Sequence, residues 1–511
     1  MNKIKKYLYV AIVVWAIVLY LMFLPAINLH SLGFWVYLLF CFVPFVLINF
    51  DYRNGPNSLK NKTFITIGIV VIVVIMLAGS IGSPYLGGLN AYRNRINIPK
   101  SSEISDIEEF DKTQVQIVDK AIAMSLADRV FGEMGADIVS QYDISNSYSS
   151  AVVNNRMYRL TPVEFSSTIK WIMTRSNGTP GYISVDVTDG NTVFHDVDAG
   201  LRYMPNACLF DNLTFHLRIK YPTFIFGDSK FEVDDEWNPY WVSEVMSYHF
   251  IDKAPDVKGV VITNPINGDC QYYDVKDVPT WVDNVYDAPL ICEQYNSYGH
   301  YVNGLFNFSQ KGETATTNDY AYLQKDGHLW MYTGITSLGS DESNVGFIYV
   351  DMQDKEVIYI VSAGAEEYSA RASAEGAVQE KRYTAVFPTM VNIDNEPVYF
   401  MGLKDDAGLI KAYAFVSYKN YQKVGVGDSV DEAYKNYTGK NVIDVDNSIE
   451  ASFTIKDIAQ AVVEGNSIFF IETEQGDYYH CSIDISNKLP FLKIGDKLTC
   501  LVKDDMIVEI K

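Results

Sequence analysis

The chain has 511 residues, a length that predicts roughly three structural units rather than one compact domain. Its formal net charge of −22 excludes nucleic acid as a partner, because phosphate binding needs clustered Lys and Arg. The same charge disfavours a soluble region that lies flat on anionic lipid.

Three apolar runs open the chain, at residues 7–24, 33–50 and 64–82, and none of them contains a charged residue. Each has the length of about 18 residues that crosses a hydrocarbon core of roughly 30 Å. A signal peptide has one shorter run, so three runs in series predict transmembrane helices within residues 1–87. A re-entrant hairpin of the first two runs is the alternative, and it leaves the third span in place.

Basic residues predict the orientation of these helices. Three lysines precede the first run, and Arg53, Lys60 and Lys62 lie between the second and third, whereas the first loop has no Lys or Arg. The positive-inside rule therefore predicts a cytoplasmic N-terminus and an extracytoplasmic location for the residues after about 87. Because no charge lies inside a span, we expect an anchor rather than an ion pathway.

The outer region is predicted to begin with a helix. Ser102 and the acidic residues up to Glu109 are typical of a helix start, since a capping hydroxyl and negative charge favour the positive end of the helix dipole. In residues 113–133, apolar residues recur every three to four positions, as in an amphipathic helix.

A strand–turn–strand pattern then repeats along the chain. It reads GYISVDVTDGNTVFHDV from Gly181, GVVITNPINGDCQYYDV from Gly259 and GFIYVDMQDKEVIYIVS from Gly346, with a diverged copy from Gly408. Asp-Gly or Asn-Gly in the first two turns supplies the positive φ of a tight hairpin. Each copy follows a helix-like stretch and one or two further strands.

The repeat predicts an α+β fold in which a helix covers one face of each antiparallel sheet. We place the four α+β units at residues 101–200, 201–280, 281–365 and 366–440. The tail, residues 450–511, alternates strongly between apolar and polar residues and is predicted to be a small five-stranded barrel of the OB type. Its few basic residues do not support oligonucleotide binding.

The six cysteines form no CxxC pair, which disfavours zinc ribbons and thioredoxin-like chemistry. Cys41 lies in an apolar run and leaves five others, an odd number, so a disulfide framework is not expected. Within the tail, a Cys481–Cys500 bridge and two buried free thiols both remain open.

The closing hairpins VDVTDGNTVF and ITNPINGDCQYY resemble those of PepSY-type domains, which are extracytoplasmic bacterial modules. Stretches such as PGYISVD, GLRYMPNA and SAEGAVQEKRY also resemble a family of bacterial membrane-anchored proteins over residues 115–435. This resemblance implies a set of domains, a cell-envelope location and the binding or restraint of proteases or other envelope proteins. It implies no catalytic mechanism.

The stretch FEVDDEWNPYWV, residues 231–242, is the most site-like hairpin. We expect a solvated turn that holds Asp234, Asp235 and Glu236, with Trp241 packed into the sheet. A calcium site made by these acids is one alternative, because carboxylates on a tight loop are calcium ligands. A stacking platform is another, and the candidate binding surface consists of five aromatic residues, Trp237, Tyr240, Trp241, Trp330 and Tyr332.

Catalytic and metal motifs are missing from the sequence: it has no HExxH, no GxSxG and no Walker A motif. The loop from Thr336, with Ser340 and Asp341, is the most enzyme-like segment, but we expect an ordinary long turn before a strand, which small polar residues with glycine also form. The sequence therefore predicts a non-enzymatic, membrane-integral protein that binds an envelope or surface protein and needs no cofactor. Binding of cell-wall polysaccharide, with Trp281 adding a further ring, is the second hypothesis, and an undetected hydrolase is the third.

Overall fold

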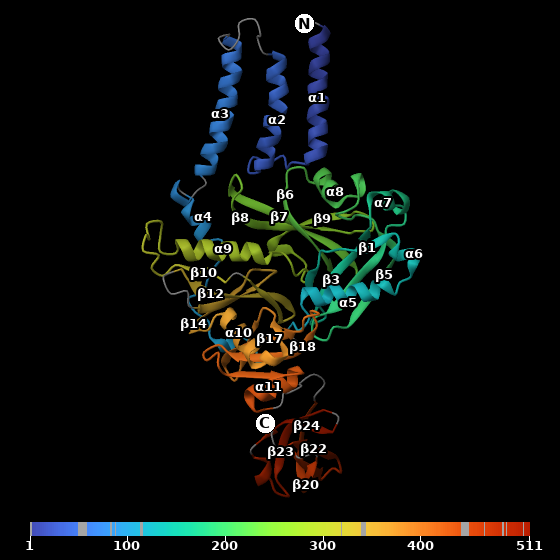
Figure 1. Cartoon of the computed structure of the whole chain (residues 1–511), viewed down its shortest axis with the longest axis vertical. Coiled ribbons are helices and arrows are strands. Elements are labelled where there is room, and N and C mark those ends of the chain that lie inside the picture. The colour runs from blue at the N-terminus through green and yellow to red at the C-terminus, as the bar shows by residue number, and fades with distance from the viewer. Residues whose placement is uncertain are drawn as a thin grey trace. The chain divides into compact units, whose positions relative to one another are not determined.

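Three helices form the N-terminal part of the computed structural model: α1 (Lys3–Phe23), α2 (Leu32–Asn49) and α3 (Leu59–Ile81) (Figure 1). Within the described residues, the windows Lys6–Phe23 and Leu32–Asn49 are long and apolar enough to cross a membrane. Only 6% of each window is buried inside the protein, so their apolar side chains face outward. Membrane crossing by α1, α2 and α3, and the orientation of these helices, stay predictions.

The structure describes residues 3–49, 59–81, 84–86, 88–112, 116–317, 319–338, 344–440, 449–463, 466–482, 485–486, 488–503 and 505–510. They divide into two compact units, Met1–Ser102 with Gln116–Ala363 and Glu103–Val115 with Gly364–Lys511. The segment Glu103–Val115 therefore belongs with the second unit, although the sequence suggested a place in the first. Phe110 explains this, because its ring packs 5.1 Å from that of Phe415 and 5.6 Å from that of Tyr434.

In the described residues, four antiparallel sheets follow the N-terminal helices. The first unit holds three of them. The first sheet consists of β1 (Tyr142–Ile144), β2 (Ser149–Val153), β3 (Arg156–Phe165), β4 (Thr179–Asp186) and β5 (Thr192–Leu201), and the second of β6 (Ile225–Val233), β7 (Pro239–Phe250), β8 (Lys253–Thr263) and β9 (Cys270–Asp274). The third sheet consists of β10 (Thr314–Thr316), β11 (Ala321–Lys325), β12 (His328–Ser337), β13 (Asn344–Asp351) and β14 (Val357–Gly364). The second unit holds the fourth, made of β15 (Thr384–Ala385), β16 (Thr389–Ile393), β17 (Glu396–Lys404), β18 (Ile410–Ser417) and β19 (Val424–Gly427).

The strand order recurs in three of the four sheets, each of which contains one of the predicted hairpins. In the first, third and fourth sheets the third strand pairs with both short strands before it, in the orders β1-β3-β4-β5, β10-β12-β13-β14 and β15-β17-β18-β19. In the second sheet one strand, β6, pairs along β7 with a register shift between Phe226 and Ser229, and it takes the place of the two short strands. The mixed α+β class is thus confirmed, and the likeness to PepSY domains stays a prediction.

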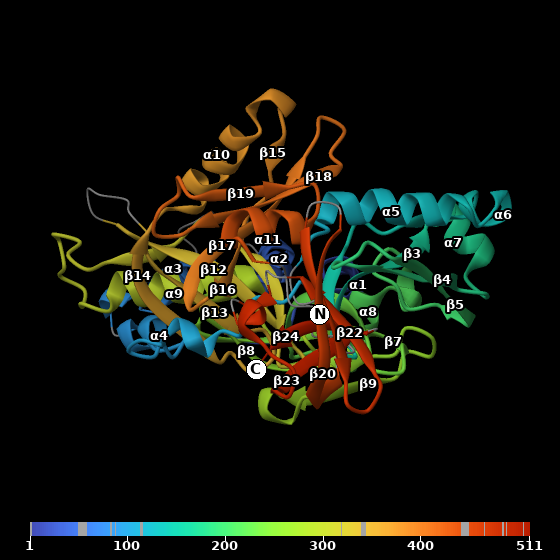
Figure 2. The same ribbon diagram turned by 90° about the horizontal axis from the view of Figure 1, so that it is seen from below.

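Helices precede each sheet: α5 (Lys120–Gly132) and α6 (Ala136–Val139), α8 (Leu213–Lys220), α9 (Ala288–Tyr301) and α10 (Glu367–Ala377). Further helices are α4 (Leu89–Arg93), α7 (Thr168–Thr174) and α11 (Val430–Thr438), and single 3-10 turns are η2 (Pro84–Leu86), η3 (Ile104–Asp106), η4 (Leu209–Asp211), η5 (Val275–Asp277), η6 (Gln379–Lys381) and η8 (Leu489–Phe491). Figure 2 shows α5 alongside the first sheet, into which it turns the buried residues Ala123, Ala127 and Phe131.

The expected helix over residues 113–133 is shorter than predicted. It begins at Lys120, because Asp119 caps it by accepting a hydrogen bond from Ile122 N at 3.0 Å. The amides of Ile117 and Val118 instead donate to the carbonyl of Val187, in an extended segment. The predicted helix start at Ser102 is also wrong, since Ser102 N donates to Tyr359 O at 2.7 Å.

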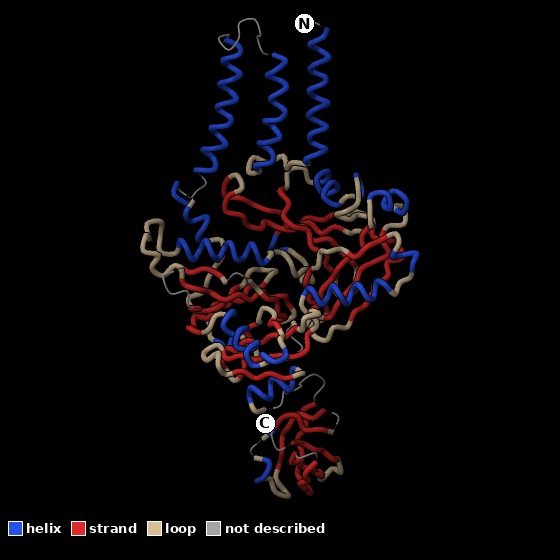
Figure 3. The backbone as a smooth tube through the Cα atoms, viewed as in Figure 1, coloured by secondary structure: helices blue, strands red, loops and turns tan. Residues whose placement is uncertain are grey.

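The tail forms a closed barrel with the order β20-β21-β22-β24-β23, which fits the predicted OB-like type (Figure 3). Its strands are β20 (Ile449–Val463), β21 (Asn466–Thr473), β22 (Tyr478–Ser482), β23 (Lys497–Lys503) and β24 (Met506–Ile510). Cys481 and Cys500 are both free and buried in its core, so of the two open alternatives the structure has the free thiols.

Three glycines of the repeated hairpins share one steric role. A Cβ on Gly181, Gly259 or Gly346 would lie 2.0, 2.2 or 2.4 Å from a carbonyl oxygen of the partner strand. Only a residue without a side chain permits this close approach of two backbones. Gly408 of the diverged copy differs, because a Cβ there would meet nothing within 4 Å.

We expect Gly346→Ala to lower the free energy of unfolding by about 2 kcal/mol, because the new methyl group forces β13 away from β14. Hydrogen exchange of the third sheet in the detergent-solubilised full chain measures this loss. The matched control is Gly376→Ala, whose methyl group meets nothing within 4 Å in α10. Equal protection in the two variants would contradict the steric role.

Sheets one to three share a single hydrophobic core, and a buried polar group joins them at its centre. Glu232 of β6 accepts hydrogen bonds from the amides of Asp283 and Asn284 at 2.9 and 3.2 Å. Asp283 in turn accepts from Val152 N of β2 at 2.5 Å and from Leu329 N of β12 at 3.2 Å. We call Glu232, Asp283 and Asn284 the carboxylate junction, because it ties one strand of each sheet together.

Candidate functional site

The hairpin at residues 231–242 is formed by β6 and β7, and Asp234 organises its turn. One carboxylate oxygen accepts from Glu236 N at 3.1 Å and from Asn238 N at 2.8 Å, and the other accepts from Asn238 Nδ2 at 3.0 Å. Asp235 and Glu236 are exposed, but Asp234 is buried, which corrects the expectation that all three acids are solvated. The carboxylate of Asp234 is thus committed to the turn.

Among the described residues no group of three or more His, Cys, Asp or Glu can hold a metal ion, so the calcium alternative gains no support.

Three of the five predicted surface rings lie in the core instead. Trp241, Trp330 and Tyr332 are 1%, 3% and 0% exposed, so the prediction that they form a binding surface is wrong. Both faces of these central strands are covered, and Trp241, for example, packs edge-on against Phe231 at 5.3 Å. For Trp241 the burial agrees with the expectation that it packs into the sheet.

Trp237 is partly exposed, but it packs against residues of the neighbouring first sheet. Its ring stacks on His195 with 4.6 Å between centroids, and Tyr158 meets it edge-on at 5.0 Å. The hydroxyl of Tyr182 donates to Trp237 O at 2.7 Å. Trp237 therefore joins the second sheet to the first and leaves little ring surface for a ligand.

Tyr240 and Trp281 form the one aromatic pair among the predicted rings that opens onto a groove. Their centroids lie 4.9 Å apart with 33° between the ring planes. The groove has a volume of about 530 Å³ and is lined by Lys220, Tyr240, Ile262, Asn264, Asp269, Cys270, Gln271, Tyr273, Pro279 and Trp281. We call this the Tyr240–Trp281 groove. Burial and the neighbouring carboxylate of Asp234 raise the pKa of Tyr240, so its hydroxyl remains protonated and able to donate.

Polar side chains of the β8–β9 hairpin form the other wall of the groove. Asn264 Oδ1 accepts from the amides of Ile266 and Asn267, and Asp269 Oδ2 accepts from Asn267 Nδ2 at 2.7 Å. In the described part of the chain, no hydrogen bond is found for Asn264 Nδ2, Asp269 Oδ1 or Gln271 Oε1. Hydrogen bonds within the hairpin thus hold each of these three side chains through one of its two polar atoms. The other polar atom of each side chain can bond to a ligand.

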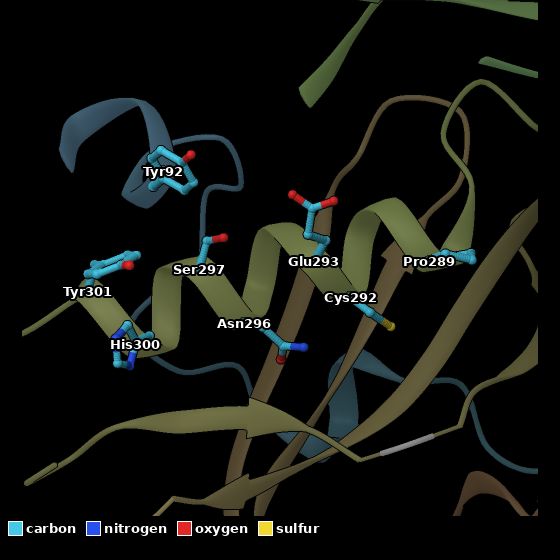
Figure 4. Close-up of a pocket in the computed structure, with 8 residues that line it drawn as sticks. All are labelled: Tyr92, Pro289, Cys292, Glu293, Asn296, Ser297, His300 and Tyr301. Carbon is cyan, nitrogen blue, oxygen red and sulfur yellow. The ribbon is translucent and has the colours of Figure 1, made fainter. Parts of the chain in front are cut away.

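A second hollow, also of about 530 Å³, lies along α9 beside α4. Figure 4 shows Tyr92 of α4 over the side of α9 that carries Ser297, whereas Cys292, Asn296 and His300 point away from it. Burial raises the pKa of the Cys292 thiol to about 11, so it is no thiolate nucleophile. The groups that line the hollow do not converge on one point, and no motif in the sequence pointed to this hollow.

Arg95 at the edge of this hollow has a structural role. Its guanidinium donates to Pro255 O at 2.8 Å and to Ser297 Oγ at 2.9 Å, and it lies 3.5 Å from the Glu293 carboxylate. These bonds attach the segment that follows α3 to both α9 and the second sheet.

Among the described histidines, four contact a neighbouring residue through a ring nitrogen: His195, His216, His300 and His328. His195 Nε2 lies 2.8 Å from Ser184 Oγ, but Ser184 is buried and the imidazole lies between Tyr182 and Trp237. Burial lowers the pKa of His195, which keeps it neutral within this stack. Ser340 and Asp341 of the enzyme-like loop lie outside the described residues.

No family model, no curated protein and no solved structure matches this chain. The geometry of the site is therefore the ground on which a function is proposed.

Proposed function

We propose that this chain is a non-enzymatic, membrane-anchored protein whose extracytoplasmic region binds an envelope or surface protein at the Tyr240–Trp281 groove. The observation that carries the proposal is the groove itself. It pairs two partly exposed aromatic rings with amide, carboxylate and ammonium groups. Tyr and Trp are the residues that most often dominate binding energy at protein interfaces.

The pre-formed wall of the groove supports binding rather than catalysis. The hydrogen bonds of Asn264, Asp269 and Lys220 hold the β8–β9 turn, since Lys220 Nζ donates to Gly268 O at 2.8 Å. A rigid surface loses little conformational entropy when a partner docks, which favours affinity.

Glycan binding is the second candidate function, and the same ring pair favours it. Two rings inclined by 33° with flanking amides can stack on a sugar ring and donate to its hydroxyls. The two candidates, a protein and a glycan, therefore share the same groove and differ in the chemical class of the ligand that it binds.

Photocrosslinking in intact cells tests both candidates. With benzoylphenylalanine at Gln271 of the full chain, we expect a covalent adduct with another protein, and Trp281→Ala should lower its yield about 10-fold. The matched control is Tyr368→Ala, which removes an aromatic ring that is 76% exposed on α10.

Absence of any protein adduct would overturn protein binding. An adduct that wall-degrading enzymes remove would support the glycan candidate instead. Equal losses in Trp281→Ala and Tyr368→Ala would show that the groove is not the contact surface.

A further inference from the structure

We propose that a second surface of the first unit enters the headgroup region of the bilayer that holds the N-terminal helices. This surface consists of Ile169, Ile172 and Met173 of α7 and Leu209 and Phe210 of η4, and we call it the lipid-facing patch. The inference rests on the proposed membrane anchorage but not on the ligand of the Tyr240–Trp281 groove.

The patch is more apolar than a water-exposed surface of this size is expected to be. Its five side chains are 68%, 60%, 72%, 62% and 69% exposed, in chain order. In α7 the core takes only Trp171, so the other apolar residues of this helix face outward. Contiguous exposed apolar side chains mark interaction sites, including membrane contacts.

The two parts of the patch are held together by ion pairs. Arg175, at the end of α7, lies 3.4 Å from the carboxylate of Asp211 in η4, and Arg202 lies 2.9 Å from the same group. Asp211 is 1% exposed, so its charge is enclosed by these two guanidinium groups. The bonds fix η4 beside α7.

Contacts with the loop between α1 and α2 place this side of the unit at the membrane surface. Arg218 of α8 donates through Nε to Leu24 O at 2.9 Å, one residue beyond the end of α1. Ile27 N donates to Pro222 O at 2.8 Å, and Asn28 Nδ2 donates to Thr223 O at 3.0 Å. The helix α8, which contacts the loop after α1, begins two residues after η4 ends. The η4 part of the patch therefore lies close in sequence to the segment that contacts the ends of the N-terminal helices. Figure 1 shows α7 and α8 on the side of the unit that faces α1 and α2.

The local charge fits anionic lipid although the chain as a whole is acidic. Residues 167–176 and 205–221 contain four basic side chains and one acidic side chain, the enclosed Asp211. Arg175 pairs with Asp211, Arg218 is 7% exposed and donates to backbone carbonyls, and Lys220 Nζ donates to Gly268 O. Lys170, which is partly exposed, is therefore the basic group that faces the headgroups. Basic residues next to a membrane surface favour anionic headgroups, while apolar side chains enter the boundary with the acyl chains. The net charge of −22 is a sum over the chain and does not describe this surface.

Photocrosslinking of the full chain in nanodiscs tests the proposal. With benzoylphenylalanine in place of Phe210, we expect lipid adducts at a yield at least about fivefold above those from the same probe at Tyr368, which is as exposed but lies in the second unit. Anionic phospholipid should raise the yield over purely zwitterionic lipid, and added salt should remove that difference.

Two controls separate this proposal from the anchorage on which it rests. A probe at Phe40, exposed on α2, must give lipid adducts, and its failure would overturn the anchorage itself. Ile172→Glu should lower the adduct yield at position 210 severalfold, whereas Val361→Glu, at an exposed apolar residue of β14, should leave it unchanged. Adducts at Phe40 with no excess at position 210, or a protein adduct in place of lipid, would overturn the lipid contact.

Discussion

Asp283→Ala is expected to lower the free energy of unfolding of the first unit by about 4 kcal/mol. The substitution leaves Val152 N of β2 and Leu329 N of β12 without their buried acceptor. It also removes the carboxylate that lies beside Glu232, so the carboxylate junction loses its link to two of three sheets. Removing one member of a buried polar network costs the desolvation of every group left unpaired.

Hydrogen exchange of the full chain in detergent measures this loss, because exchange of β2, β6 and β12 reports the opening of the first unit. Asp283→Asn keeps one acceptor oxygen and should lose about half as much stability. Asp235→Ala, on the exposed part of the 231–242 hairpin, is the matched control and should change stability by no more than about 0.5 kcal/mol. A loss for Asp283→Ala within that range would refute the role of the junction.

The second large effect is a loss of stability as the pH rises through the neutral range. Glu244 of β7 is 3% exposed, and burial raises the pKa of its carboxyl to about 8. Its Oε1 has no hydrogen-bond partner among the described residues, and the backbone of Gly227 leaves the space that its Oε2 occupies. The folded unit therefore favours the protonated form of Glu244.

The sign of the pH effect follows from proton linkage. Below the ordinary pKa of a glutamate both states hold the proton and the stabilisation is complete. Above that value the unfolded chain releases the proton first, so the free energy of unfolding falls with rising pH until the folded pKa, about 8, is passed. At about 1.4 kcal/mol per pH unit, the rise of the pKa from 4.5 to about 8 contributes a loss on the order of 5 kcal/mol.

Exchange protection measured from about pH 5 to about pH 8, corrected for intrinsic exchange rates, tests this slope. Glu244→Gln should make the slope shallower, since an amide does not titrate in this range and the buried carboxyls of Glu232 and Asp283, whose pKa values are also raised, still contribute. Asp235→Asn, an acid on the same sheet but on the exposed turn, should keep the slope of the natural chain. Identical slopes in the Glu244→Gln variant and the natural chain would refute the assignment.

Local sequence signals predicted the turns of this protein well. Asp189-Gly190 and Asn267-Gly268 lie in hairpin turns, with φ of +77° at both glycines, and the barrel at the tail follows its alternation. Such signals succeed because turn and strand preferences act between residues that are neighbours in the chain. The helix starts were less accurate, because an extended pairing with Val187 competes with the helical pattern before Lys120.

The candidate site was only half predictable. Tyr240 and Trp281 were both named from the sequence, but their pairing joins residues 41 positions apart and depends on how the second sheet folds. Trp330 and Tyr332 carry the same aromatic pattern and lie in the core, because a period of two does not say which face of a sheet is covered.

The sequence by itself determined the apolar helices, the repeated hairpins and the positions of the turns, since each depends on contacts within a few residues. The tertiary structure alone decided which rings are buried, how Glu232 meets Asp283, why Glu244 retains its proton and where the exposed apolar side chains of α7 and η4 gather. These features depend on distant strands whose packing sets burial and charge environment, and no pattern along one segment contains that information.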